Sequence, residues 1–358
     1  MKRFISIILV TVMMFACAAP AFAVQAEPEQ TAVSAAAEEN GDSAFIVFFD
    51  KLFAKIRAFF GSVKYCFVVK KEGAPNTMNK NAIHMLKSVE DAIGDSFIIT
   101  TEDGKVIAID GGYKFETDYF IQYLRAVTGQ LVPKIDAWFL THPHTDHVQV
   151  FNEVAENRTN QVKFDKVILK YAPYDFYASI NSTEGAEMVG EFDRISKAFP
   201  EKVQIINDGD VFNIGAAKIT TLFTFDPAFT NVNDASLIFR MDLGGKSILF
   251  TGDAGVSSGN KVLENPEYKE LLDCDICKMS HHGQAGVSKE FYEAVDPEIC
   301  LWPTPSWVWN NSHETLVLLT PEVRAWIEEI GVEKNYLSWQ GSQVIYPDQL
   351  TPDTEDIL

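Results

Sequence analysis

Short apolar runs recur along the chain from about residue 96 and end in glycine or polar residues, which is typical of buried β-strands. These runs occupy residues 96–100, 106–109, 135–140, 235–242, 246–251, 274–279 and 298–302. Asp103-Gly104 and Gly244-Gly245 separate two pairs of runs and predict two hairpins. Apolar positions with helical spacing lie among the strands, at residues 116–128, 183–198, 287–294 and 321–330. The alternation predicts an α/β domain in which helices flank β-sheets.

The first 23 residues have the pattern of a secretory signal peptide. Lys2 and Arg3 precede a mostly apolar, uncharged segment at 4–16, and residues 21–23 form an Ala-x-Ala cleavage pattern. We expect cleavage after Ala23; the alternative is lipidation at Cys17, which the large Phe15 disfavours. The apolar segment is shorter than the ~20 residues that a membrane-spanning helix needs. The pattern predicts a bacterial protein that is secreted or associated with the cell envelope.

Two further segments precede the strands. Residues 24–43 are rich in Ala, Glu and Gln without an apolar period, and we expect a flexible linker there. Residues 44–61 place bulky apolar side chains at helical spacing with charged residues between them, which predicts an amphipathic helix. Two interpretations stay open: a helix docked on the following domain, or a helix that contacts a membrane surface or a partner through residues 44–60.

The rest of the chain divides simply. Residues 62–348 are predicted to form one folded, catalytic domain, and residues 349–358 an acidic, loose tail. Residues 171–200, rich in Tyr, Phe and Glu, are interpreted as an insertion into that domain.

Charge and cysteine content narrow the function classes. The chain has 30 basic and 50 acidic residues, a net charge of -20, and therefore repels the nucleic-acid backbone unless a local basic patch intervenes. We therefore expect no nucleic-acid partner. Cys66, Cys274, Cys277 and Cys300 remain after residue 23, and Cys274-x-x-Cys277 has no second cysteine pair to complete a zinc knuckle. We expect buried thiols at 274 and 277, while the disulfide state stays open.

The histidines are concentrated in a few short segments. The chain has 7 His, and His142, His144 and His147 fall within one run of six residues that also contains Asp146. Imidazole nitrogen and carboxylate oxygen are ligands that zinc accepts readily. The run follows the predicted strand at 135–140, so one loop after a strand end could serve two adjacent metals.

His142-x-His144-x-Asp146-His147 resembles the signature of the metallo-β-lactamase-fold hydrolases. The resemblance implies a four-layer αββα sandwich and two divalent metal ions, zinc or alternatively manganese or iron. It implies that Asp110, at the end of the strand before Gly111-Gly112, orients a metal-binding histidine. It also implies that Asp253, after the strand at 246–251, bridges the two metals.

One departure from the family pattern points to a particular branch. No histidine occurs from residue 148 to 280, whereas the full pattern has one there. Asn233-x-x-Ser236-Leu237 before the bridging strand and the His281-His282-Gly283 turn after it resemble the hydrolase domain of bacterial competence proteins and, more distantly, bacterial phosphocholine esterases.

The resemblance implies two ligand sets. One metal takes His142, His144, Asp253 and one histidine of the pair, with His282 preferred over His281. The other takes Asp146, His147, Asp253 and His313. His281 is then left to stabilise charge on the substrate, while Asp146 or Asp253 accepts a proton from the attacking water, a metal-bridging hydroxide being the expected nucleophile.

The expected function is that of an exported phosphodiesterase acting on a small-molecule or cell-surface substrate. A lactonase or other carboxyl-ester hydrolase at the same site, and a non-catalytic binding protein on the same scaffold, are the alternatives. Trp307 and Trp309 precede His313, and aromatic rings bind cationic head groups well. They are expected to contact substrate, together with Asn233 and Ser236, unless the tryptophans only pack in the core or a lid.

Overall fold

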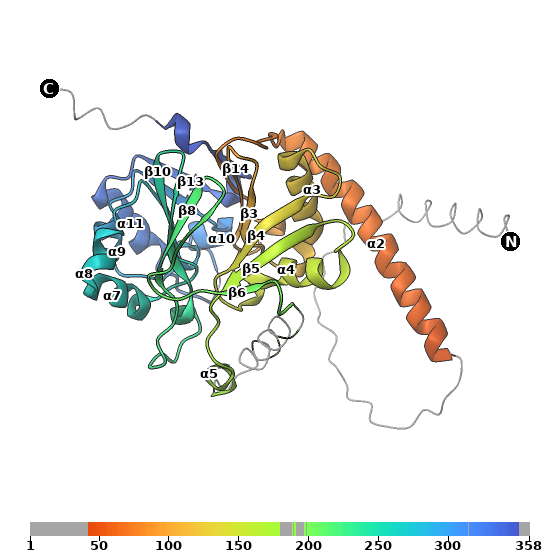
Figure 1. Ribbon diagram of the computed structural model, residues 1–358, viewed down its shortest axis with the longest axis horizontal. Coiled ribbons are helices and arrows are strands. Elements are labelled where there is room, and N and C mark those ends of the chain that lie inside the picture. Colours follow the sequence, from red (N-terminus) through yellow and green to blue (C-terminus); the bar gives the residue numbers. More distant parts are fainter. Residues whose placement is uncertain are drawn as a thin grey trace. The chain divides into compact units, whose positions relative to one another are not determined.

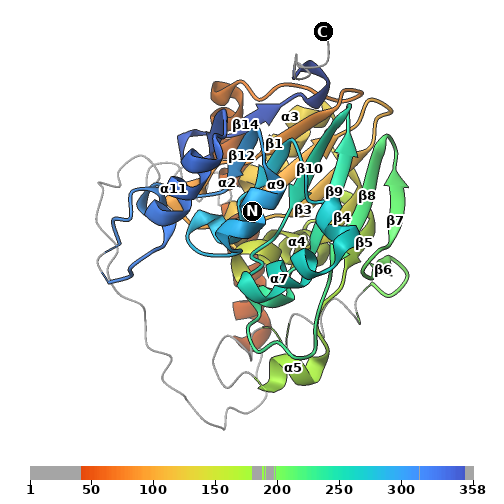
Figure 2. The same ribbon diagram turned by 90° about the vertical axis from the view of Figure 1, so that its left-hand side faces the viewer.

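The architecture rests on two mixed seven-stranded sheets (Figures 1 and 2). The computed structural model describes residues 42–179, 188, 190, 197, 199–313 and 315–350, and for residues 42–51, 53–54 and 57–58 it describes the backbone alone. The first sheet has, in spatial order, the strands β14 (Gln343–Ile345), β1 (Ala82–Met85), β2 (Ser96–Thr100), β3 (Val106–Asp110), β4 (Lys134–Leu140), β5 (Lys163–Leu169) and β6 (Val203–Ile205). The second has β13 (Lys334–Leu337), β12 (Ile299–Trp302), β11 (Ile276–Lys278), β10 (Lys246–Phe250), β9 (Ile238–Leu243), β8 (Ala217–Phe223) and β7 (Val211–Ile214).

Each sheet combines hairpins with parallel strands. The predicted hairpins join β2 to β3 and β9 to β10, both antiparallel. Strands β3 to β6 run parallel, and so do β10 to β13. Most residues of the central parallel strands are apolar because both faces of such a sheet are covered, whereas β5, nearer the edge, begins with exposed charged residues.

The facing surfaces of the two sheets form the central core. Phe139 of β4 stacks on Phe239 of β9 with ring centroids 4.8 Å apart, and Phe97 of β2 meets Phe250 of β10 at 5.5 Å. Trp138, the neighbour of Phe139, points to the opposite face and stacks on Phe120 of a flanking helix at 5.2 Å. This alternation is the two-residue period of a strand that is buried on both sides.

Helices cover both outer faces (Figure 1). One buried cluster joins the first sheet to α3 (Thr117–Thr128) and α4 (Thr145–Asn157), and another joins the second sheet to α7 (Val256–Glu264), α9 (Lys289–Val295) and α11 (Thr320–Ile330). The shorter helices are α5 (Tyr174–Ser179), α8 (Pro266–Glu270) and α10 (Ser306–Trp309). The predicted four-layer αββα sandwich is confirmed.

Three predicted helical segments correspond to α3, α9 and α11 within two residues, whereas the prediction at 183–198, like most of the predicted insertion, lies largely outside the described residues. Five of the described helices were not predicted, the longer α4 and α7 and the short α5, α8 and α10. Helix α4 begins inside the histidine-rich run, where the polar ligands obscure its apolar period. The three cysteines Cys274, Cys277 and Cys300 are buried free thiols in the cluster on the outer face of the second sheet.

The predicted helix at 44–61 is longer than its pattern indicated. Helix α2 (Asp42–Glu72) continues eleven residues past the predicted end, through the segment assigned to the start of the domain. The extension is stabilised from one side, because Tyr65 and Val69 are buried against the cluster that contains α3. The described residues from 53 onward belong to one compact unit. The predicted signal peptide, nearly all of the linker and the tail from residue 351 lie outside the described residues. Within the described part, we find no helix with the length and apolarity required to cross a membrane.

Candidate metal centre

The candidate site lies where the carboxyl ends of strands from both sheets meet. Asp110 ends β3, His142 lies two residues after the end of β4, Asp253 follows β10, and His281 follows β11. Carboxyl ends of neighbouring parallel strands share one edge of a sheet, and crevices at this edge are the usual ligand sites of α/β folds. Four segments that are far apart in sequence therefore contribute to one cluster.

The histidine-rich loop turns directly into α4. His144 precedes the helix, and Asp146 and His147 lie in its first turn, where negative charge is favoured by the helix dipole. The rings of His142 and His144 approach closely, with His142 Nε2 2.8 Å from His144 Nδ1. His142 and His147 are fully buried.

Asp110 fixes the orientation of His147. One carboxylate oxygen of Asp110 accepts the backbone N–H of Thr141 at 2.8 Å, and the other lies 2.8 Å from Nδ1 of His147. The second oxygen also accepts the Thr141 hydroxyl at 2.7 Å. Nδ1 of His147 is thereby engaged and Nε2 faces the cluster. The structure places Asp110 where the family resemblance implied.

Asp253 lies at the centre of the cluster. Its Oδ2 atom is 3.3 Å from His147 Nε2, 3.4 Å from His282 Nε2 and 3.9 Å from His142 Nε2. Its backbone N–H donates to the Ser236 hydroxyl at 3.1 Å. Ser236 is fully buried, so its predicted contact with substrate is wrong and it instead holds the backbone of Asp253.

The adjacent histidines His281 and His282 occupy the 3-10 turn η4 (Ser280–Gly283), and both have left-handed backbone angles, with φ of 48° and 55°. Such angles are uncommon outside glycine and indicate local strain at a functional site. His282 is buried, donates Nδ1–H to the Pro303 carbonyl at 3.0 Å and directs Nε2 to Asp146 Oδ2 at 3.1 Å. His281 lies at the rim, 3.9 Å from Asp253 Oδ2.

Three groups of potential ligand atoms lie close together: Asp146, His147, Asp253 and His282; His142, His144 and Asp253; and Asp95, Asp110 and His147. The two carboxylates of the third are already engaged, Asp95 by Lys278 and Asp110 by Thr141 and His147, so the first two are the candidate ligand groups. This corrects the predicted sets: His282 belongs with Asp146 and His147, because its Nε2 lies 3.1 Å from Asp146 Oδ2. Asp253 is common to both groups, as predicted.

The electrostatics of the cluster favour cations. Burial alone would lower the pKa of His282, but Asp253 and Asp146 raise it to about 9. Burial alone would raise the pKa of Asp146, but His147 and His282 lower it to about 2. Nε2 of His147 is buried without a hydrogen-bond partner, although carboxylate oxygens surround it. A buried nitrogen in such a position fits a metal ligand.

A buried lysine, Lys278 at the end of β11, lies beneath the cluster. It pairs with the equally buried Asp95, donates to the Gly252 carbonyl at 2.6 Å and lies 3.6 Å from Asp253 Oδ1. Asp253 therefore directs Oδ1 to an ammonium group and Oδ2 to the histidines. Of its two oxygens, Oδ2 is therefore the one that lies near histidines of both ligand groups.

A pocket of ≈ 320 Å³ opens above the cluster. Asp146, Asp253 and His282 form part of its wall, and His281, Asn233 and Gln284 converge beside them. His281 Nε2 lies 3.5 Å from Asn233 Nδ2 and 3.4 Å from Gln284 Nε2. Asn233 is placed at the pocket as predicted.

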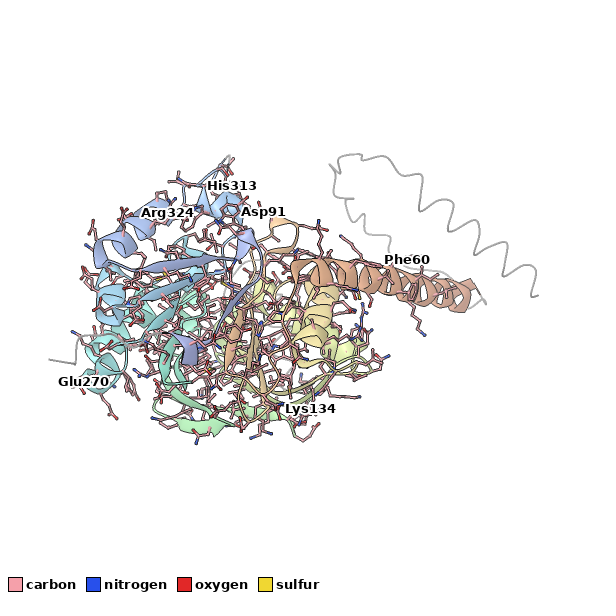
Figure 3. The ribbon with its side chains drawn as sticks, turned by 90° about the horizontal axis from the view of Figure 1, so that it is seen from above. Phe60, Asp91, Lys134, Glu270, His313 and Arg324 are labelled. Atoms are coloured by element: carbon pink, nitrogen blue, oxygen red, sulfur yellow. The ribbon has the colours of Figure 1, made fainter. Side chains whose placement is uncertain are left out.

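The structure does not bring His313 or the tryptophans into this site. His313 is exposed and its Nδ1 accepts the backbone N–H groups of Thr315 and Leu316 at 3.2 and 3.1 Å. Figure 3 shows His313 at the periphery, near Asp91 and Arg324. The predicted role of His313 as a ligand is wrong, because its loop leaves the strand ends and uses the ring nitrogen for its own backbone.

Trp307 and Trp309 are also displaced from the predicted substrate contacts. Trp307 donates to the Asp91 carbonyl at 3.2 Å, and Trp309 packs between Trp302 and the guanidinium of Arg324. Neither lines the pocket among the described residues.

Four residues of the site were missed from the sequence: Asp95, Lys278, Gln284 and Tyr113, the last of which lines the pocket. Lys278 had a usable signal, since it is a charged residue in an apolar strand three positions before the histidine pair. Asp95, Tyr113 and Gln284 lie in turns with no distinguishing pattern.

Comparison with known families decides the classification. The sequence model of the metallo-beta-lactamase superfamily matches residues 89–302, more than half of the chain. The chain belongs to the metallo-β-lactamase superfamily. The family, the fold and the prediction of an enzyme are thus confirmed, and the superfamily consists mostly of metal-dependent hydrolases. The matched segment contains both ligand groups and ends before His313.

Individual relatives are distant. ComE operon protein 3 of Bacillus subtilis is 24% identical over 180 residues, which cover 49% of this chain and 20% of that protein, so the chain spans about a fifth of its length. The metallo-β-lactamase-fold protein YhfI of B. subtilis is 11% identical, with a TM-score of 0.44 over 74% of this chain and 99% of that one. The diiron β-hydroxylase CmlA of Streptomyces venezuelae is 15% identical, with a TM-score of 0.46 over 75% and 54%.

Proposed function

We propose that this member of the superfamily is a phosphodiesterase that uses two divalent metal ions. The observation that carries the proposal is the pair of ligand groups that share Asp253 at the wall of a pocket. His142, His144 and Asp253 would hold one ion, and Asp146, His147, Asp253 and His282 the other. When bound, such a pair lowers the pKa of water and polarises a phosphoryl oxygen.

The side chains around the ligand groups have separate proposed roles. Asp146 lines the pocket, and its low pKa keeps it ionised, so it is available to accept a proton from the attacking water. Asp253 is held ionised by the histidines around it, while Lys278 fixes its orientation from beneath. Burial lowers the pKa of His281, so the ring is neutral near pH 7 and can donate one N–H to a substrate oxygen on which charge develops.

The lining of the pocket supports a substrate of low charge. Among the residues that the structure describes, the pocket is lined by no lysine or arginine, and its rim carries the amides of Asn233 and Gln284. A phosphodiester has one negative charge, whereas a phosphomonoester has close to two and would call for cationic side chains. A neutral carboxyl ester or lactone satisfies the same lining and is the competing substrate class.

The deciding test is hydrolysis of bis(p-nitrophenyl) phosphate by residues 24–358, with and without a chelator and after metal is restored. Turnover that the chelator abolishes and zinc or manganese restores supports the proposal. No turnover by protein that carries two metal ions per chain would overturn the phosphodiesterase assignment, and a parallel panel of p-nitrophenyl esters and lactones would then identify the alternative.

Metal identity and location complete the proposal. We infer zinc, because both groups combine imidazole and carboxylate donors, and metal analysis of protein grown without supplement tests it against manganese and iron.

We further propose that the protein is exported and loses residues 1–23, on the signal-peptide pattern of the sequence. Mass spectrometry of protein from the native envelope and medium would give Val24 as the first residue; a retained Met1 would contradict export by this route.

A further inference from the structure

We propose that α2 attaches the catalytic domain to an anionic lipid surface through a face that the domain leaves uncovered. The proposal is independent of the reaction and concerns residues 53–72, which belong to the same compact unit as the catalytic domain.

One face of α2 is already occupied by the domain. Tyr65 packs edge-on against Tyr119 of α3 with centroids 5.8 Å apart, and Val69 is buried in the same cluster. Ser62 accepts the side-chain amide of Gln122 at 2.6 Å, and Glu72 accepts the Tyr119 hydroxyl at 2.7 Å. These positions follow helical spacing, so α2 is fixed by a single stripe.

The opposite face has a second apolar stripe. Its members recur three or four residues apart and are Ile56, Phe59, Phe60, Val63 and Phe67. Phe59 is 65% and Phe67 70% exposed, and Val63 is 40% exposed. A soluble helix that is docked on one side normally presents polar residues on the other, so this stripe marks an interaction surface. Figure 3 labels Phe60 on α2.

The charge of α2 indicates that its exposed apolar stripe contacts an anionic membrane surface. Residues 51–71 contain six Lys or Arg and no Asp or Glu, in a chain whose net charge is -20. Lys55, Lys64, Lys70 and Lys71 are exposed beside the stripe. Bulky apolar side chains flanked by lysines are the features of helices that lie in the interface of anionic membranes. A second copy of α2 would bring like charges together, which disfavours self-association through this face.

The test is co-sedimentation of the chain from residue 24, which keeps every described residue, with phosphatidylcholine vesicles that contain either 30% or no phosphatidylglycerol. These vesicle compositions are of the kind used for peripheral proteins, and we expect at least about tenfold tighter binding to the anionic vesicles, weakened by salt. The triple substitution F59A/F60A/F67A should lower that binding about tenfold, because it removes apolar area and keeps helix propensity.

A matched control substitutes two exposed apolar residues elsewhere, L131A/V317A, and should bind like the unaltered protein. Unchanged thermal stability and turnover in solution confirm that the variants are folded. Equal binding to both vesicle types, or none to either, would overturn the proposal. A dimer that light scattering detects in the unaltered chain and not in F59A/F60A/F67A would overturn it in favour of a second copy as the occupant.

Discussion

Two regions that contain histidine illustrate what makes a candidate metal ligand in this fold. In the first, His142 to His147, the rings lie at the end of a buried strand and the start of a helix, and neighbouring side chains engage their outer nitrogens. In the second, around His313, the ring is exposed and its nitrogen accepts N–H groups of its own loop. Residue type is the same in both, but only in the first does a nitrogen face a shared centre.

The difference lies in the surroundings rather than in the spacing. In both His147 and His282, Nδ1 hydrogen-bonds to a protein oxygen, and this bond orients Nε2 toward the carboxylates. His84 provides a third case: it is buried, yet Thr77 and Tyr123 satisfy both of its nitrogens at 2.8 and 3.2 Å. A histidine is thus a ligand, a core residue or a loop cap according to which of its nitrogens remains available.

The largest effect is expected from Asp253→Ala, which removes the carboxylate common to both ligand groups. Metal content should fall from two ions per chain to less than one, and turnover should drop at least about a thousandfold. Metal analysis and steady-state rates measure the two outcomes. Asp242→Ala, at an acid paired with Arg240 on β9, is the control and should retain both ions. Full metal content in Asp253→Ala would refute the shared centre.

The next effect concerns the floor of the site. Lys278→Met should lower the free energy of unfolding by about 3–5 kcal/mol, because it leaves the buried Asp95 without its ion-pair partner. Urea unfolding measures the change. Lys289→Met removes a half-exposed lysine from an ion pair with Glu329 and should cost less than about 1 kcal/mol. Asp95→Asn added to Lys278→Met should restore part of the loss. Equal losses of unfolding free energy in Lys278→Met and Lys289→Met would show that the buried ion pair contributes no more to stability than the exposed one.

His84 predicts a pH dependence that is independent of metal. Burial lowers its pKa to about 3, whereas the unfolded chain titrates near 6.5. The unfolded state therefore binds more protons between these values, and stability is lost as pH falls from about 6.5 toward 3. Between pH 7 and pH 4.5 the expected loss in the free energy of unfolding is about 2–3 kcal/mol. Urea unfolding in the presence of a chelator measures the free energy of unfolding at both pH values. The loss on acidification should be smaller in His84→Gln than in the unaltered protein by this amount. An equal loss in the two proteins would exclude His84 as the cause.

The smallest effect is expected from His313→Ala. The ring is exposed and absent from both ligand groups, so metal content should stay at two ions and turnover should change less than about twofold. His282→Ala, assayed alongside, should lose metal. Loss of one ion in His313→Ala would reinstate it as a ligand and require the loop to close on the site.

Sequence patterns were sufficient for the framework of this protein. Apolar runs of strand length and two glycine turns located β2–β3 and β9–β10, and the histidine-rich run located four of the residues in the ligand groups. Such features are local, so neighbouring residues determine them.

What the sequence could not provide depends on distant contacts. The pairing of His282 with Asp146 joins residues 136 positions apart, and no spacing rule encodes it. The buried partner of Lys278, Asp95, lies in the loop immediately before β2 of the other sheet. The length of α2 was underestimated for the same reason, since Tyr65 and Val69 are buried only because α3 lies beside them.

The turn that carries His281 and His282 has a consequence for selectivity. His281, whose ring lies at the rim, and His282, whose ring is buried, are consecutive residues with left-handed backbone angles. A backbone rotation at either residue would therefore displace the ring of the other. Gly283 follows with φ of +73° against Trp302, which leaves the turn little room to absorb a shift. On the proposed function, this turn couples the metal ion that His282 would hold to the position of the His281 ring at the pocket. We therefore predict that protein with less than two metal ions per chain discriminates less between phosphodiester and carboxyl-ester substrates, as a comparison of turnover at graded metal content would measure.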